Sequence, residues 1–77
     1  MNTDNKVKEI LTDMCGRETI NLDDQLQKDL SLDSLMMVML LLQIEDVFGI
    51  ELEQSDMNPL NLITVQDVID MVEKYDV

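Results

Sequence analysis

The feature that most constrains this sequence is an apolar stretch that begins directly after an acid and a hydroxyl. Residues 35–42 read L-M-M-V-M-L-L-L, and Gly49 follows Phe48 a few residues later. Asp33 and Ser34 are residue types that commonly begin a helix, and a glycine in the left-handed conformation ends many helices. We therefore predict one helix from about Ser34 to Phe48.

This helix carries more apolar surface than a small core can bury. At about 100° per residue, one stripe of it faces the core. The stripe consists of Met37, Leu40, Leu41, Ile44 and Phe48. The opposite side includes Asp46 but is otherwise apolar, and its residues are Leu35, Val38, Met39 and Leu42. A second apolar face on a small domain is typical of a surface that binds a partner.

Missing residue types exclude several functions. The 77 residues include one cysteine, no histidine and no tryptophan, so an internal disulfide, a common zinc site and a histidine-dependent catalytic triad are all excluded. The acidic loop pattern of an EF-hand is absent as well. We predict a single domain, residues 1–77, with no catalytic residue and no metal site.

The N-terminus and the apolar run predict a location for the protein. The first five residues are polar, without the basic and apolar regions of a secretory signal. The longest apolar run, Leu35 to Leu42, is too short to span a bilayer. We expect a cytoplasmic protein.

The net charge of −12 is distributed unevenly along the chain. Between Asp29 and Glu73 there are ten acids and no lysine or arginine. Such a field repels nucleic-acid phosphates and anionic lipid headgroups, and it favours basic partner surfaces. We therefore expect no nucleic-acid partner and no membrane partner. Maintaining solubility accounts for part of this acidity.

Two further helices are predicted by capping residues and periodicity. Thr3 or Asp4 can cap a first helix that Gly16 ends, and Thr64 can cap a last helix together with Asp67. The first helix has a stripe of Val7, Ile10, Leu11 and Met14. The last helix has a stripe of Val65, Val68, Ile69 and Val72.

The segments between these helices are less regular. Residues 17–33 form an unusually long connection, which recurring apolar residues can attach to the core. We expect it to cross the bundle, so that the first two helices are roughly parallel in projection or steeply crossed. A short helical turn is predicted around Met57 to Leu62, where Pro59 is tolerated at a first helical position. The fold class is all-α, a small four-helix bundle with three main helices and one short helix.

The predicted core is thin. Its side chains are Leu, Ile, Val and Met, without large aromatic residues. The gain from burying so few side chains is nearly cancelled by the entropy cost of ordering the chain. We expect that a slender apolar guest can open this core.

Three interpretations of Asp33 and Ser34 remain open on the residues alone. They can be only a cap and a first-turn residue, worth about 1 kcal/mol. A catalytic serine needs a base, and without histidine only Lys28 is at hand. Ser34 can instead be an attachment point that another enzyme modifies. A phosphate there would lie beside unpaired backbone N–H groups at the positive end of the helix dipole.

The arrangement of motifs resembles that of the acyl carrier proteins. The chain reads D-L-S-L-D-S-L, then V-M-L-L-L-Q-I-E-D-V-F-G-I-E-L, and later T-V-Q-D-V-I-D-M-V. The first two segments are similar to the family's core motif, and the third is similar to the T-V-x-D-x-V-D-x-I segment of its last helix. The resemblance covers essentially the whole chain.

The resemblance implies a site and a function. Ser34 would bear 4′-phosphopantetheine as a phosphodiester, and Asp33 would cap the helix and help a phosphopantetheinyl transferase position the hydroxyl. The protein would be a monomeric carrier that catalyses nothing and presents acyl or related thioesters to acyl-loading, condensing or acyl-transfer enzymes. The expected docking face comprises Leu35, Met36, Val38, Met39, Leu42, Glu45 and Asp46.

The sequence departs from the family pattern at three positions. Met36 and Met39 stand where fatty-acid-type carriers usually have acids, and Ser31 stands where a glycine is usual. Neutral drift explains this simply. We favour partners that are less basic and dock by hydrophobic contact, as in a specialised biosynthetic pathway. The alternative function is a non-catalytic helical interaction module, whose Met-rich apolar face would grip an amphipathic segment of another protein.

Overall fold

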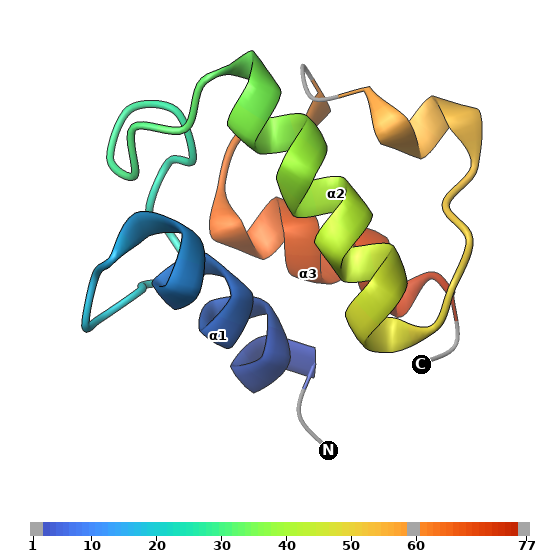
Figure 1. Cartoon of the computed structure of the whole chain (residues 1–77), viewed down its shortest axis with the longest axis horizontal. Coiled ribbons are helices and arrows are strands. Elements are labelled where there is room, and N and C mark those ends of the chain that lie inside the picture. Colours follow the sequence, from blue (N-terminus) through green and yellow to red (C-terminus); the bar gives the residue numbers. More distant parts are fainter. Residues whose placement is uncertain (1–2, 59–60, 76–77) are drawn as a thin grey trace.

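A computed structural model of the chain describes residues 3–58 and 61–75. Its elements in chain order are the helices α1 (Thr3–Cys15) and α2 (Ser34–Phe48), the 3₁₀ helix η1 (Gln54–Met57) and the helix α3 (Val65–Glu73). Figure 1 shows α2 lying across α3, with α1 beside them. Within the described residues the only β pairing is an isolated bridge between Gln25 and Thr64. The predicted all-α fold of three main helices and one short helix is confirmed.

Helix α2 begins and ends where the sequence predicts. The Asp33 carboxylate accepts the Met36 N–H at 2.9 Å, which satisfies one of the unpaired donors of the first turn. At the other end Gly49 has a φ of 67°, and its N–H donates to the Glu45 carbonyl. The left-handed conformation is accessible to glycine without a steric penalty, so this residue closes the helix.

The two other long helices agree with their predicted caps in part. Helix α1 starts at Thr3, so both Thr3 and Asp4 lie inside the helix and the residue before it falls outside the described part of the chain. Helix α3 has the predicted capping box. The Thr64 hydroxyl accepts the Asp67 N–H at 3.2 Å, and the Asp67 carboxylate accepts the Thr64 N–H at 3.1 Å.

The core lies where the three long helices meet. Helix α2 buries its predicted stripe except for Phe48, which is half-buried at the edge of the core beneath the Lys6 ammonium group, 5.4 Å from the ring centroid. Met14 of α1 is only partly buried, and it also packs against the core. The buried apolar residues of the helices are Val7, Ile10 and Leu11 of α1, Met37, Leu40, Leu41 and Ile44 of α2, and Val65, Val68, Ile69, Met71 and Val72 of α3.

The long connection between α1 and α2 packs against the start of α3. The Leu26 N–H donates to the Ile63 carbonyl at 2.8 Å, and the Val65 N–H donates to the Asp24 carbonyl at 3.0 Å. In the view of Figure 1, α1 and α2 run in opposite directions, so the expected parallel projection is wrong. The connection uses its length to reach α3. Its buried anchors are Ile20, Leu26, Leu30 and Leu32.

The described short helix η1 overlaps the predicted turn only at Met57. The expected turn at Met57 to Leu62 included Pro59 and Leu60, which fall outside the described residues, whereas η1 already ends at Met57. Its turn closes because the Glu53 carbonyl accepts the N–H groups of both Asp56 and Met57, at 2.9 and 3.2 Å. A second turn does lie within the predicted range, because the Asn61 N–H donates to the Asn58 carbonyl at 3.1 Å. The predicted role of Pro59 lies outside the described residues.

A polar cluster ties η1 to the end of α3. The Lys74 Nζ lies 3.0 Å from one carboxylate oxygen of Asp56, and the Tyr75 hydroxyl donates to the other oxygen. The Glu53 N–H donates to the Tyr75 hydroxyl at 2.9 Å. The pKa of Asp56 lies below its ordinary value, mainly because of the hydrogen bond from Tyr75 and secondly because of that from Lys74. In turn, Asp56 raises the pKa of both Tyr75 and Lys74. We call Asp56, Lys74 and Tyr75 the clasp.

The lowered pKa of Asp56 predicts how the clasp responds to pH. A carboxylate with a depressed folded-state pKa stabilises the fold above its unfolded-state pKa of about 3.9, and this contribution is lost as pH falls through the folded-state value. We therefore expect the Asp56→Asn variant to be less stable than the parent near neutrality, with a difference that shrinks towards about pH 2. Urea unfolding midpoints across this range measure it.

The comparison of the two proteins isolates the clasp, because acid also relieves the net negative charge in both, which is −12 in the parent and one unit less negative in the variant. A difference in unfolding midpoint that stays constant from neutral pH to acid would contradict the prediction.

Candidate functional site

Ser34 is the first residue of α2, and it is exposed. Asp33 precedes it with an extended backbone, and both its carboxylate and its backbone carbonyl accept hydrogen bonds from the start of the helix. Its carboxylate accepts the Met36 N–H, and its carbonyl accepts the Met37 N–H at 2.9 Å. The Ser34 side chain therefore projects from the positive end of a well-capped helix dipole.

The approach to Ser34 contains a strained residue. Ser31 has a φ of 60° and is the only non-glycine residue with positive φ in the described part of the chain. Leu30 and Leu32 are buried on either side of it. A left-handed conformation at a non-glycine residue costs about 1–3 kcal/mol, and it persists where the surroundings enforce it. Here the two buried leucines fix the turn that leads into α2.

The predicted outer face of α2 is exposed and continuous with Ser34. The exposed fractions of its apolar side chains are 69% for Leu35, 38% for Val38, 43% for Met39 and 51% for Leu42. No described element covers these residues. We call these four the outer face; it provides an unpartnered apolar surface immediately beside the exposed hydroxyl.

The other three residues predicted for docking differ from one another in exposure. Asp46 is exposed, but Glu45 is half-buried, and its carboxylate accepts the Leu52 N–H at 2.8 Å. Glu45 therefore also holds the chain that follows α2. Met36 is half-buried against the core, so it presents only part of its side chain to a partner.

Two exposed apolar residues were not predicted. Val47 is 44% exposed and Ile63 is 56% exposed. Val47 lies near the end of α2 between the buried stripe and the outer face, where helical periodicity does not decide exposure. Ile63 lies in an irregular segment, where its carbonyl pairs with the connection. The exposure of these two side chains is therefore decided by tertiary structure and not by the local sequence pattern.

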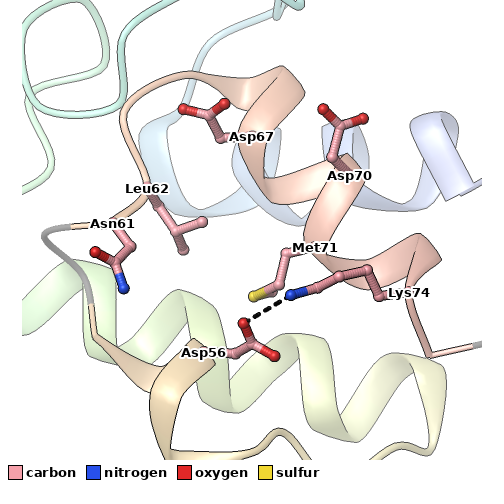
Figure 2. A pocket seen from close by; sticks show the side chains of 7 residues that line it. All are labelled: Asp56, Asn61, Leu62, Asp67, Asp70, Met71 and Lys74. Carbon is pink, nitrogen blue, oxygen red and sulfur yellow. Dashed lines mark hydrogen bonds and ion pairs between the residues drawn. The ribbon is translucent and has the colours of Figure 1, made fainter.

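A cavity of about 280 Å³ lies between η1 and α3. Figure 2 shows its lining, with the Asp56–Lys74 ion pair on one side and the Asp67 and Asp70 carboxylates at the other. Its apolar lining consists of Leu62 and Met71, which both belong to the core. Asn61 completes the lining. The cavity thus connects a polar rim with the interior.

Comparison with known proteins assigns the family. The family model described as "Phosphopantetheine attachment site" matches residues 5–72. An acyl carrier protein of Solidesulfovibrio magneticus is 36% identical over 76 residues, which cover 96% of this chain and 95% of that protein. The chain belongs to the acyl carrier protein family.

Two solved structures are similar to this carrier protein in fold. A candidate acyl carrier protein from Mycobacterium tuberculosis has a TM-score of 0.85 and 26% identity, covering 95% of this chain and 97% of that one. The acyl carrier protein of Thermotoga maritima has a TM-score of 0.74 and 29% identity, covering 92% and 82%. The chain is therefore a non-catalytic carrier with covalently attached 4′-phosphopantetheine. It interacts with a phosphopantetheinyl transferase and with acyl-handling enzymes.

None of the helices in residues 3–58 and 61–75 has the length and apolar character needed to cross a membrane.

The positive φ of Ser31 predicts that glycine is a better residue at this position of the carrier. Ser31→Gly removes the steric penalty on the left-handed conformation, although it increases the entropy of the unfolded chain. We expect the free energy of unfolding to rise by up to about 1 kcal/mol, measured by urea denaturation. Ser31→Ala is the control, because it removes the same hydroxyl but keeps a Cβ. Equal stabilities for the two variants would contradict the prediction.

Proposed function

We propose that Ser34 is the residue that bears the phosphopantetheine arm, and that residues 1–77 act as one carrier domain. The observation that supports this is the position of an exposed serine in the first turn of α2, directly after its Asp33 cap. A phosphodiester there is stabilised by the positive end of the helix dipole and by nearby backbone N–H groups. The arm's terminal thiol then holds an acyl or related group as a thioester.

The outer face of α2 is the docking surface in this proposal. It begins at Leu35, the residue after Ser34, and extends along the helix to Leu42. An enzyme that binds this face receives the arm in its active site, because attachment point and contact surface are adjacent. Asp46 adds an exposed carboxylate at the far end. The partners are acyl-loading, condensing or acyl-transfer enzymes, and the carrier meets them as a cytoplasmic monomer.

The carried group also has a place to shelter in the carrier. The cavity between η1 and α3 reaches Leu62 and Met71, which are both at most 7% exposed. Removing an apolar chain from water is favourable by about 25 cal/mol per Å² of buried surface. The thin core predicted from the sequence therefore has a specific entry point. We infer that a carried apolar chain rests there between encounters.

A mass measurement tests the attachment. We expect incubation with coenzyme A and a broad-specificity phosphopantetheinyl transferase to add one arm to the parent protein and none to Ser34→Ala. Ser55→Ala is the matched control, because Ser55 is exposed on η1 and should leave the gain unchanged. Intact-mass spectrometry reads the result.

The same measurement addresses the alternative. An arm that attaches to Ser34→Ala as fully as to the parent would refute the proposed site. If the parent itself gained no mass, the Met-rich face would instead favour an interaction module that grips an amphipathic segment.

The second part of the proposal concerns the chemistry of the partners. Met39 is apolar, 43% exposed and part of the outer face. A partner that covers it by hydrophobic contact would have to desolvate a carboxylate introduced there, which costs at least about 1–3 kcal/mol without a compensating hydrogen bond. Partners of this kind are less basic than enzymes that recognise an acidic helix, and they point to a specialised biosynthetic pathway.

Met39→Glu tests this inference. We expect transfer of the carried group by the cognate partner enzyme to fall by about tenfold, because roughly 1.4 kcal/mol of contact energy corresponds to that factor. The control is Gln27→Glu, which adds the same charge to an exposed residue of the connection, outside α2. Unchanged transfer by Met39→Glu, or an equal loss in both variants, would contradict docking by hydrophobic contact at Met39.

A further inference from the structure

The helix η1 has little share in the core. None of its four residues is buried, and only Asp56 and Met57 are partly covered. Leu52 before it and Leu62 after it are buried, and each is 7% exposed. The Leu52 N–H is also fixed to the Glu45 carboxylate at 2.8 Å. The helix η1 is therefore a small flap between two buried leucines.

The clasp joins this flap to the end of α3. Asp56 accepts from the Lys74 ammonium group at 3.0 Å and from the Tyr75 hydroxyl, and Tyr75 also accepts the Glu53 N–H. The Lys74 side chain is 62% exposed. The Asp56 side chain is only 17% exposed, but an ion pair whose lysine lies largely in water contributes little to stability. The flap can therefore separate from α3 without unfolding the three long helices, whose contacts are buried and apolar.

The same residues border the cavity. Asp56 and Lys74 are part of both the clasp and the cavity lining, as Figure 2 shows, while Leu62 and Met71 lie deeper and belong to the core. A closed clasp thus places a polar pair over an apolar interior. When Asp56 moves away with η1, the cavity widens on the side where this pair stands.

We propose that Asp56, held by Tyr75 and Lys74, is a latch that keeps η1 closed against α3 and controls the entry of a carried chain into the cavity. This inference rests on the proposed sheltering of the carried group. The charge of the rim selects among carried groups as well. Three carboxylates, those of Asp56, Asp67 and Asp70, surround the entrance with one lysine. A chain that ends in a carboxylate is repelled there, whereas an uncharged apolar chain is admitted.

Latch opening is measured without any arm attached. In Tyr75→Phe and in Asp56→Asn we expect the backbone amides of residues 53–57 to exchange with solvent at least tenfold faster than in the parent, while amides in the middle of α2 change much less. The control is Asp70→Asn, which removes a rim charge outside the clasp; Asp70 interacts with Gln66 on its own helix. Unchanged exchange of the flap in both clasp variants, or equal acceleration in the control, overturns the latch.

Entry of the carried chain is measured on proteins that mass spectrometry shows to be fully loaded. Methyl-labelled methionine supplies probes on the flap (Met57) and at the cavity (Met71), with Met14 on α1 as a reference. On loading octanoyl, we expect the shift of the Met71 methyl signal to be at least twice as large in Tyr75→Phe as in the parent. An octanedioyl chain, which is attached through one carboxyl group and ends in a free carboxylate, should produce less than half of that shift.

The outcomes separate the latch from the proposed function. Equal octanoyl shifts at Met71 in parent and clasp variants, despite faster exchange of the flap, would show that the clasp does not control entry. Equal shifts for the charged and uncharged chains would overturn the selection by the rim. Failure of the arm to attach at Ser34 appears in the mass spectrum and leaves the exchange measurement intact.

Discussion

Helix α2 has apolar side chains on two opposite sides, but the other helices cover only one of these sides. Met37, Leu40 and Leu41 are completely inaccessible to solvent, and Leu35 and Leu42 on the other side are more than half exposed. Each buried side chain of this size contributes about 1.5–3 kcal/mol, so the orientation of α2 about its axis is strongly determined. This orientation places Ser34 beside a bare apolar surface.

The rest of the chain supports α2 from one side and leaves the outer face uncovered. The connection that precedes it is drawn to α3 by the Leu26–Ile63 hydrogen bond, and the segment that follows it is held by Glu45 and the clasp. In the proposed function, the carrier presents its arm on one surface while a carried chain enters from another. Docking and sheltering then involve different elements, and they can alternate without rearranging the long helices.

Structural features that depend on residues close together in the chain could be predicted from the sequence. The limits of α2 follow from Asp33 and Gly49, and the capping box of α3 follows from Thr64 and Asp67, because each cap acts within a few residues. Periodicity also separated the buried stripe of α2 from its outer face. Ser34 could be named as a candidate attachment point because the sequence itself indicates a hydroxyl at a helix start and an apolar helix face beside it.

The remaining features depend on contacts between residues far apart in the chain. The position of η1 reflects a clasp in which Tyr75 reaches back nineteen residues to Asp56, and no local pattern indicates that pairing. The path of residues 17–33 is set by backbone hydrogen bonds to the start of α3, which carry no signature in side-chain type. The positive φ of Ser31 is likewise a product of the buried leucines that flank it.

The most direct test of the account is to isolate the intact protein from its own cells and locate its modification by fragmentation mass spectrometry. The account predicts a phosphopantetheine arm on Ser34, bearing a thioester in part of the population. Protein that never carries the arm at Ser34, although an active transferase is abundant in the same cells, would contradict it.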